Sequence, residues 1–170
     1  MREKRALLIA AALTLLWMGV IFRFSAQPSD VSAALSGSLL EALLSAVVPR
    51  WNSRSPAEQQ SLLDCLHTLF RKCGHFSEYT ILGILLTATV RRIPGLISDS
   101  RQAFPKRKII LPALCALLYA VSDEIHQSFV PGRSCELRDV CIDFAGACTG
   151  ILLASVFLRL RRRIRRKKQP

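Results

Sequence analysis

Apolar residues in this chain fall into four blocks separated by shorter polar segments. The blocks cover residues 6–24, 72–90, 109–129 and 138–158. A helix needs about 20 mostly apolar residues to cross the hydrocarbon core of a bilayer. The pattern therefore predicts an all-α, polytopic membrane protein, with four transmembrane helices in a single domain that covers residues 1–170.

The segment between the first two blocks has a different pattern. Residues 29–48 look too polar to span a bilayer, and their larger apolar side chains recur every four residues: Val31, Leu35, Leu39, Leu43 and Val47. A stripe of this kind is typical of an amphipathic helix that lies on a membrane surface or caps a bundle. We expect an extracytoplasmic helix here that ends at Pro49.

Three local signals place the other helix ends. The sequence SPAE at 55–58 combines an N-cap serine, a proline at the first helical position and a glutamate at the third. This helix should run on into the second span, or break near Gly74. Pro112 is expected in the first turn of the third span, where proline is tolerated. The sequence VPGR at 130–133 has Pro and Gly at the central positions of a type II turn, so the last two spans should be adjacent and antiparallel.

Basic residues gather at the ends of the apolar blocks. A net charge of +12 would suggest nucleic-acid binding in a soluble protein, but here the charges flank spans, so we expect no nucleic-acid partner. The side of the membrane that holds both termini carries 17 of the 24 Lys and Arg residues, and the other side carries 7. By the positive-inside rule both termini are cytoplasmic. The tail at 159–170 should attract anionic lipid.

The first block is expected to remain in the protein. It follows a basic start, as a signal peptide does, but its apolar run is longer than a typical signal and no good small-residue cleavage site comes after it. The six cysteines form no CxxC pair and have no metal-ligand spacing, so we interpret them as apolar filler. Whether any of them form a disulfide stays open.

Ionisable and polar residues gather where three spans reach the outer side. They are Lys72, His75, Glu78 and Tyr79 on the second span, Asp123, Glu124, His126 and Gln127 on the third, Arg133 in the turn, and Asp139 and Asp143 on the fourth. Each lies within about two turns of a helix end, so they share one depth. Ionisable residues in such places mark a functional site by default.

Helical spacing indicates where two of these carboxylates point. Asp139, Asp143, Gly146 and Gly150 lie on one narrow stripe of the fourth span. The two glycines have the GxxxG spacing that lets another helix approach closely. The carboxylates should therefore face the interior of the bundle.

Several segments are similar to the VanZ-like family of bacterial membrane proteins. They are KCGHFSEYTILGILL at 72–86, DEIHQSFVPGR at 123–133, D-V-x-x-D-x-x-G at 139–146 and WMGVIFRFSAQPSDVS at 17–32. The resemblance covers nearly the whole chain and implies a multi-pass protein of the bacterial plasma membrane with a role in the cell envelope. The family takes its name from a teicoplanin-resistance protein, so glycopeptide tolerance is implied without a defined reaction. Asp143 stands where many family members have Asn, which adds a carboxylate.

One interpretation of the cluster is catalytic. His75 and His126 are acid/base candidates because each lies near a carboxylate that could orient its ring. The catalytic candidates are His75, Glu78, Asp123, Glu124, His126 and Asp139, and the binding candidates are Lys72, Tyr79, Gln127, Arg133 and Asp143. Arg133 and Lys72 would hold an anionic headgroup. The partner would be a membrane lipid or a lipid-linked cell-wall precursor.

Other interpretations stay open. In a structural one the groups satisfy one another, Lys72 with Asp139 or Asp143, and Glu78 with His126 or Arg133, in a non-catalytic scaffold or interaction protein.

A divalent metal is a further alternative, because His75 with Glu78 and Asp123 with His126 share an i, i+3 spacing. Lys72, one turn from His75, would repel a cation, so we expect no cofactor. A transporter is disfavoured because no span has polar residues at its midplane.

Overall fold

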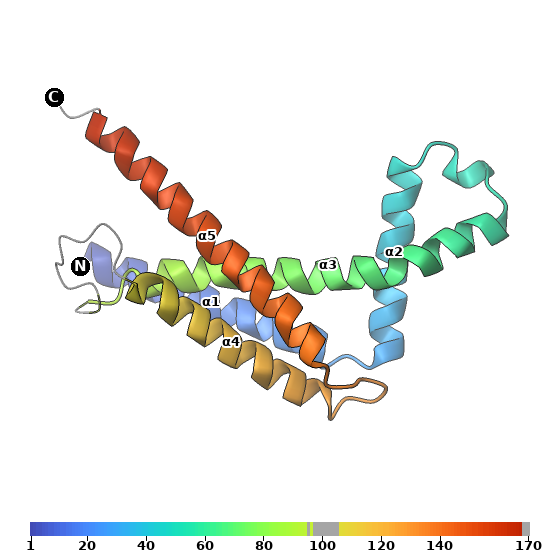
Figure 1. Ribbon diagram of the computed structural model, residues 1–170, viewed down its shortest axis with the longest axis horizontal. Helices are drawn as coiled ribbons and strands as arrows, with labels where there is room; N and C mark the ends of the chain where they lie inside the picture. Colours follow the sequence, from blue (N-terminus) through green and yellow to red (C-terminus); the bar gives the residue numbers. More distant parts are fainter. Residues whose placement is uncertain (95, 97–105, 168–170) are drawn as a thin grey trace.

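The structure, a computed structural model, describes residues 1–94, 96 and 106–167. It consists of five α-helices and one short 3-10 helix (Figure 1): α1 (Arg2–Ser25), α2 (Ser29–Val47), η1 (Trp51–Ser53), α3 (Pro56–Val90), α4 (Arg107–Gln127) and α5 (Leu137–Lys167). No strand occurs among these residues. The predicted all-α class is confirmed.

Four of the helices are long and apolar enough to cross a membrane: α1, α2, α4 and α5. The fold is therefore that of a polytopic helical membrane protein, as the pattern predicts. The expectation that 29–48 is too polar to span is wrong by length and composition, because only Asp30 and Glu41 are charged there. Helix α3 is not among the four, and its second half, 72–90, carries part of the polar cluster.

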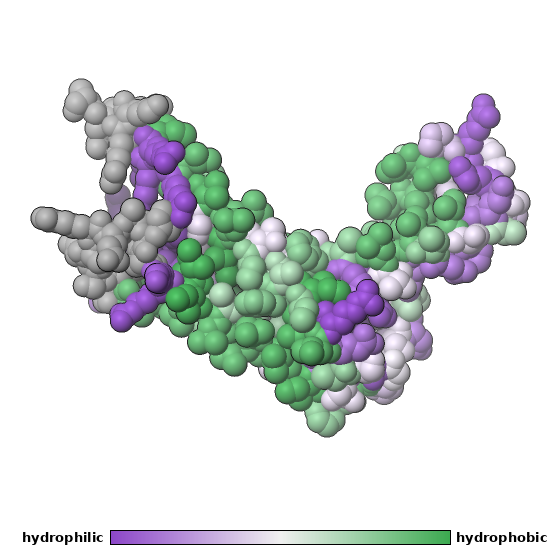
Figure 2. All heavy atoms as spheres, viewed as in Figure 1, coloured by the Kyte–Doolittle hydropathy of each residue, from purple (hydrophilic) through white to green (hydrophobic). Residues whose placement is uncertain are grey.

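The arrangement in space separates α2 from the other helices. Helices α1, α3 and α4 run side by side, α5 crosses them at an inclination, and α2 runs across their direction (Figure 1). Hydrophobic residues cover the middle of the bundle on the face shown, and hydrophilic residues gather toward its two ends (Figure 2). The half of α3 at 72–90 thus lies among the three long apolar helices of the bundle.

The segment from α2 to the first half of α3 forms a small core of its own. Leu40 and Leu44 of α2 pack with Trp51, against the apolar side chains Leu62, Leu63, Leu66 and Phe70 of α3. The predicted stripe from Val31 to Val47 points away from this core, and its members are 41–69% exposed. The stripe therefore does not cap the bundle and is free to face lipid.

The start of α3 follows its sequence signal. The Ser55 hydroxyl accepts a hydrogen bond from the Glu58 backbone N–H at 3.3 Å, and the Glu58 carboxylate accepts one from the Ser55 N–H at 3.0 Å. The Ser55 N–H, and then the Ser55 hydroxyl, which also donates to this carboxylate, hold the pKa of Glu58 below its usual value. The helix continues unbroken through Gly74, so the alternative of a break there is wrong.

Two helix bounds differ from expectation. Helix α4 begins at Arg107, so Pro112 lies in its second turn rather than its first. Helix α5 continues past Arg159 to Lys167 instead of ending with the apolar block. Arg and Lys are good helix formers and are favoured near a helix C-terminus, so the basic tail extends the helix.

Helices α3 and α5 touch backbone to backbone. A Cβ atom built on Gly146 would overlap the carbonyl of Phe76, and one on Gly150 would overlap the carbonyl of Thr80. Gly83 of α3 meets α5 in the same way, at the carbonyl of Ala147. The predicted close approach along the glycine stripe is confirmed, and the partner helix is α3.

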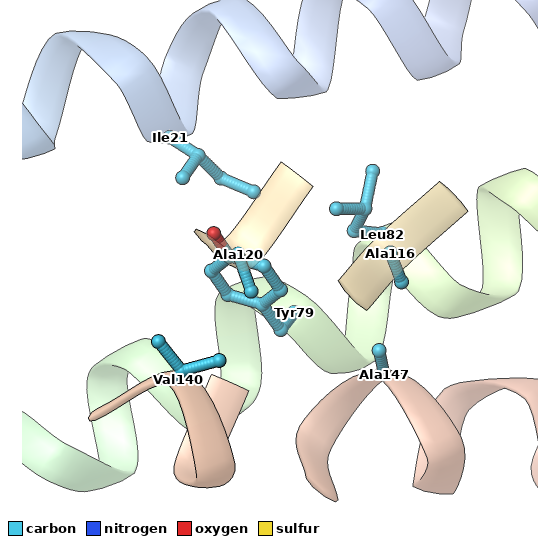
Figure 3. Packing of buried hydrophobic residues seen from close by; sticks show 7 residues of the cluster. All are labelled: Ile21, Tyr79, Leu82, Ala116, Ala120, Val140 and Ala147. Carbon is cyan, nitrogen blue, oxygen red and sulfur yellow. The ribbon is translucent and has the colours of Figure 1, made fainter. Parts of the chain in front are cut away.

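Small residues let a large side chain fill the centre of the bundle. Tyr79 of α3 lies among Ile21 of α1, Ala120 of α4 and Val140 of α5 (Figure 3). Its side chain is fully buried. Because Tyr79 also lies near Asp123, the hydrophobic core of the bundle borders the polar residues that form the site.

Gly146→Leu should prevent normal packing of α3 on α5, because the new side chain would displace a backbone. We expect a loss of stability at or above the roughly 1–3 kcal/mol typical of overpacking, measured as thermal unfolding in detergent and as membrane yield. Gly19→Leu is the matched control, since nothing lies within 4 Å of a Cβ built there. Equal stability of the two variants would contradict this packing.

Candidate functional site

Three carboxylates lie inside the bundle at the end where α1, α3 and α4 meet the start of α5. Asp123 is 3% exposed, Glu124 is 2% exposed and Asp143 is 1% exposed. Burial of ionisable groups is costly unless they are paired. Their partners therefore decide what the site can do.

Asp123 is held by α1 and by its own helix. One of its oxygens, Oδ2, accepts a hydrogen bond from the Ser25 hydroxyl at 2.8 Å and one from the Gln127 side-chain amide at 3.1 Å. The other, Oδ1, has no partner among the described residues. The Tyr79 hydroxyl lies near this carboxylate without hydrogen-bond geometry to it.

Arg133 fastens the turn between α4 and α5 to the rest of the bundle. Its Nε donates to the Gln27 carbonyl at 3.0 Å, and its two terminal nitrogens donate to Gln127 Oε1 at 3.0 Å and to the Phe24 carbonyl at 3.4 Å. Burial, and then the nearby Arg71, lower the pKa of Arg133, yet a guanidinium stays charged in proteins. Three of its donors thus serve protein acceptors, so the structure favours a positioning role over the predicted headgroup contact.

The turn itself has the predicted form. Gly132 adopts a positive φ of 73°, as the third position of a type II turn requires, and the Arg133 N–H donates to the Val130 carbonyl at 3.1 Å. Beyond the turn, the Glu136 N–H donates to the Glu124 carboxylate at 3.0 Å. These bonds bring the start of α5 against the end of α4.

Two close pairs of ionisable side chains join the half-buried residues. Lys72 pairs with Asp139, where the sequence left Asp139 and Asp143 as alternatives, and the two side chains are 14% and 19% exposed. His75 Nδ1 lies 3.9 Å from Glu78 Oε2, with 19% and 24% exposure. The sequence left His126 and Arg133 as possible partners of Glu78. In the structure its close neighbour is instead His75, on its own helix.

His126 lies at the α1 side of the site. Its ring stacks on Phe22 with 4.4 Å between the ring centroids. Its Nε2 is buried and has no hydrogen-bond partner in the described part of the chain. The ring is therefore held by packing while one nitrogen stays available.

Asp143 is the least satisfied residue of the site. Neither of its carboxylate oxygens has a hydrogen-bond partner among the residues that the structure describes. It lies close enough to interact electrostatically with the other carboxylates, which are Asp123, Glu124, Asp139 and Glu78. The great majority of buried polar atoms are paired in folded proteins, so two unpaired oxygens on one buried carboxylate are unusual. The structure thus brings the predicted site residues together. Some of their buried polar atoms have no hydrogen-bond partner among the described residues.

A family model for VanZ/LLP1 matches residues 10–158. The chain belongs to the VanZ/LLP1 family. This confirms the resemblance read from the sequence, and the matched range contains every residue of the site. Searches of the curated proteins and of the solved structures find no match.

The metal alternative requires several ligand side chains to converge in this VanZ/LLP1 protein. Within the described ranges, no group of three or more His, Cys, Asp or Glu side chains is arranged to hold a metal ion. Lys72 adds a positive charge beside His75.

Sequence reasoning missed the contribution of α1. Ser25, Phe22 and the carbonyls of Phe24 and Gln27 all contact site residues. The Trp17 indole N–H also donates to the Glu78 carbonyl at 2.9 Å. The one signal was the WMGVIFRFSAQPSDVS segment of the VanZ resemblance, which contains all of these residues.

Lys72→Met should destabilise the protein by about 1–3 kcal/mol, less than for a fully buried pair, because Asp139 would lose its partner while still reaching some solvent. The double variant Lys72→Met/Asp139→Leu should recover most of this loss. Thermal unfolding of the purified protein measures both. Asp139→Leu alone completes the comparison. If the double variant loses as much stability as the two single variants lose together, the two side chains are not coupled.

Proposed function

We propose that this protein acts in the bacterial plasma membrane as a cell-envelope protein, whose polar site binds the head of a lipid or a lipid-linked cell-wall precursor. Contribution to glycopeptide (teicoplanin) tolerance is the proposed outcome. Family membership supports the envelope role. The observation that carries the binding role is Asp143, a carboxylate 1% exposed with both oxygens unpartnered among the described residues.

The unpartnered atoms suggest the chemistry of the ligand. Asp123 Oδ1 and both oxygens of Asp143 are acceptors when ionised, and His126 Nε2 is one when it carries no proton. The two nearby cations, Lys72 and Arg133, already serve protein acceptors. A head rich in hydrogen-bond donors, such as sugar hydroxyls or an amine, therefore fits better than an anion.

The half-buried residues supply the access side of the site. Lys72, His75, Glu78 and Asp139 are 14–24% exposed, whereas Asp123, Glu124 and Asp143 are buried behind them. A ligand would meet these four half-buried side chains first and the unpartnered carboxylate oxygens last. His75 and His126 remain the acid/base candidates if a reaction follows binding.

The proposed topology has four spans: α1, residues 72–90 of α3, α4 and α5 up to residue 158. It is supported by the position of 72–90 among the other three helices and by the excess of basic residues at the end that holds both termini. Helix α2 would lie on the outer surface with its exposed Val31 to Val47 stripe in the headgroup region. Both termini would be cytoplasmic.

A non-catalytic scaffold is the second candidate, and specific contacts favour it. The Lys72–Asp139 pair, the Arg133 contacts and the Ser25–Asp123 bond each join different helices, as register-fixing polar pairs do. This reading accounts for the paired atoms. It leaves the unpartnered atoms of Tyr79 and Asp143 without a role.

Topology can be tested with single cysteines. In a chain that keeps only Cys135, which is exposed in the turn before α5, an impermeant thiol reagent added to intact cells should label the protein. A chain with Pro94→Cys as its only cysteine should be labelled only after the cells are opened. The reverse pattern would overturn the proposed orientation.

Function can be tested with two tyrosines that differ in one bond. The Tyr79 hydroxyl has no partner in the described structure, whereas the Tyr119 hydroxyl donates to the Met18 carbonyl at 2.6 Å. Tyr79→Phe should keep full abundance and abolish the tolerance that expression confers. Tyr119→Phe should lose about 1 kcal/mol of stability and keep tolerance in proportion to its abundance.

His126→Ala and Asp123→Asn extend the same test. Variants that remain abundant and inactive support a ligand site, whereas inactivity that follows a loss of abundance supports the scaffold. Normal tolerance in abundant Tyr79→Phe and His126→Ala proteins would sink the binding proposal. Teicoplanin susceptibility and immunoblots of membranes supply the two readouts.

A further inference from the structure

A groove lies between α3 and α5 at the opposite end of the bundle from the polar site. The two helices cross closely at Gly146 and Gly150, and α5 then inclines away from α3 toward its C-terminus (Figure 1). The divergence leaves a groove of about 530 Å³. This volume falls within the range of ordinary ligand sites.

The walls of the groove are apolar and its end is basic. Ile84 on α3, with Leu153 and Phe157 on α5, are among the apolar residues that line it. Four arginines close the end: Arg91, Arg92, Arg161 and Arg162. An apolar groove that ends in positive charge matches the two parts of a phospholipid, the apolar acyl chains and the phosphate.

Among the described residues that line the groove, none is acidic and able to neutralise these arginines. The Arg91 guanidinium donates to the Ser155 hydroxyl at 3.2 Å, and Arg92 donates to the Ala88 carbonyl at 2.5 Å. Arg91 Nε is buried without a hydrogen-bond partner in the described residues. Burial, and then the charge of Arg162, lower the pKa of Arg91. In the described part of the chain, the groove therefore supplies no carboxylate as a counter-charge to these arginines.

We propose that this groove binds one anionic phospholipid of the cytoplasmic leaflet. Its acyl chain would lie along Ile84, Leu153 and Phe157, and its phosphate would meet the four arginines. Basic pockets between spans on the cytoplasmic side commonly take anionic headgroups. This goes beyond the outer polar site and beyond a general attraction of the basic tail, because Arg163 and Arg165 share the tail and do not line the groove.

The test uses the full chain, purified in a mild detergent, with added phosphatidylglycerol or phosphatidylcholine. Native mass spectrometry should show retained phosphatidylglycerol, and its apparent Kd should weaken at least tenfold in Arg161→Gln/Arg162→Gln. The control Arg163→Gln/Arg165→Gln removes the same charge from the same helix and should change the Kd less than twofold. Glycerol phosphate, which has the headgroup chemistry without acyl chains, should not compete.

A filling variant separates shape from charge. Ala88→Trp keeps every arginine and places a large side chain in the groove, so it should also lose phosphatidylglycerol. Equal losses in the two arginine pairs would overturn the proposal in favour of tail electrostatics alone. Equal binding of the two lipids by the wild-type chain would overturn it as well, and neither result bears on the outer site.

Discussion

The backbone contact between α3 and α5 sets where the polar side chains of these two helices lie in the site. Gly146 and Gly150 leave no Cβ between the two helices, and Gly83 does the same from the α3 side. Asp143 and Asp139 continue the glycine stripe toward the start of α5, so the contact that brings the backbones together also turns these carboxylates into the bundle. The chain runs in the same direction along both helices, so Lys72 of α3 lies against Asp139 of α5.

The site that results is partly satisfied and partly not. Contacts across helices satisfy Lys72, Arg133 and one oxygen of Asp123. Asp143 and the Tyr79 hydroxyl keep buried atoms without partners in the described structure. An unpaired buried polar group costs about 1–3 kcal/mol, and more if charged. A protein held together by the glycine contact can bear this cost, and a ligand that supplies donors would remove it.

The same contact also explains the groove at the other end. Helices that cross closely at glycine must diverge where larger side chains follow, and α5 carries Leu153 and Phe157 beyond Gly150. The end at the start of α5 therefore gathers carboxylates, and the end toward the C-terminus of α5 has a groove lined with arginine. The two ends of one helix contact thus differ in the charge of the residues that line them.

Sequence predicted the parts of the structure that depend on local pattern. The SPAE start of α3, the VPGR turn and the glycine stripe all have short-range signals, and each is confirmed. The apolar blocks fall largely within α1, α3, α4 and α5. Spacing could not choose between Asp139 and Asp143 as the partner of Lys72, because both lie on one stripe, a turn apart. Nor could it find Ser25 as the donor to Asp123, since a lone serine at a helix end carries no periodic signal.

The orientation of α2 also needed three dimensions. Its length and composition are compatible with a span, and its direction across the bundle and its packing on Trp51 set it apart from α1, α3, α4 and α5. Likewise, two donors of Arg133 serve the carbonyls of Phe24, in the last turn of α1, and of Gln27, just after α1, more than a hundred residues earlier in the chain. Contacts of that range depend on tertiary packing, which a single sequence does not reveal.

Photo-crosslinking beside the site tests most directly whether it binds a ligand. A photoreactive amino acid at position 71 would replace Arg71, which lies near His75 and Arg133 and is outside the proposed ligand-binding set. Irradiation of intact cells, followed by mass spectrometry of the purified protein, should give an adduct with the mass of a lipid or lipid-linked head, and Tyr79→Phe should suppress it. Crosslinks only to neighbouring helices, unchanged by Tyr79→Phe, would contradict a ligand site and leave the polar cluster as a structural device.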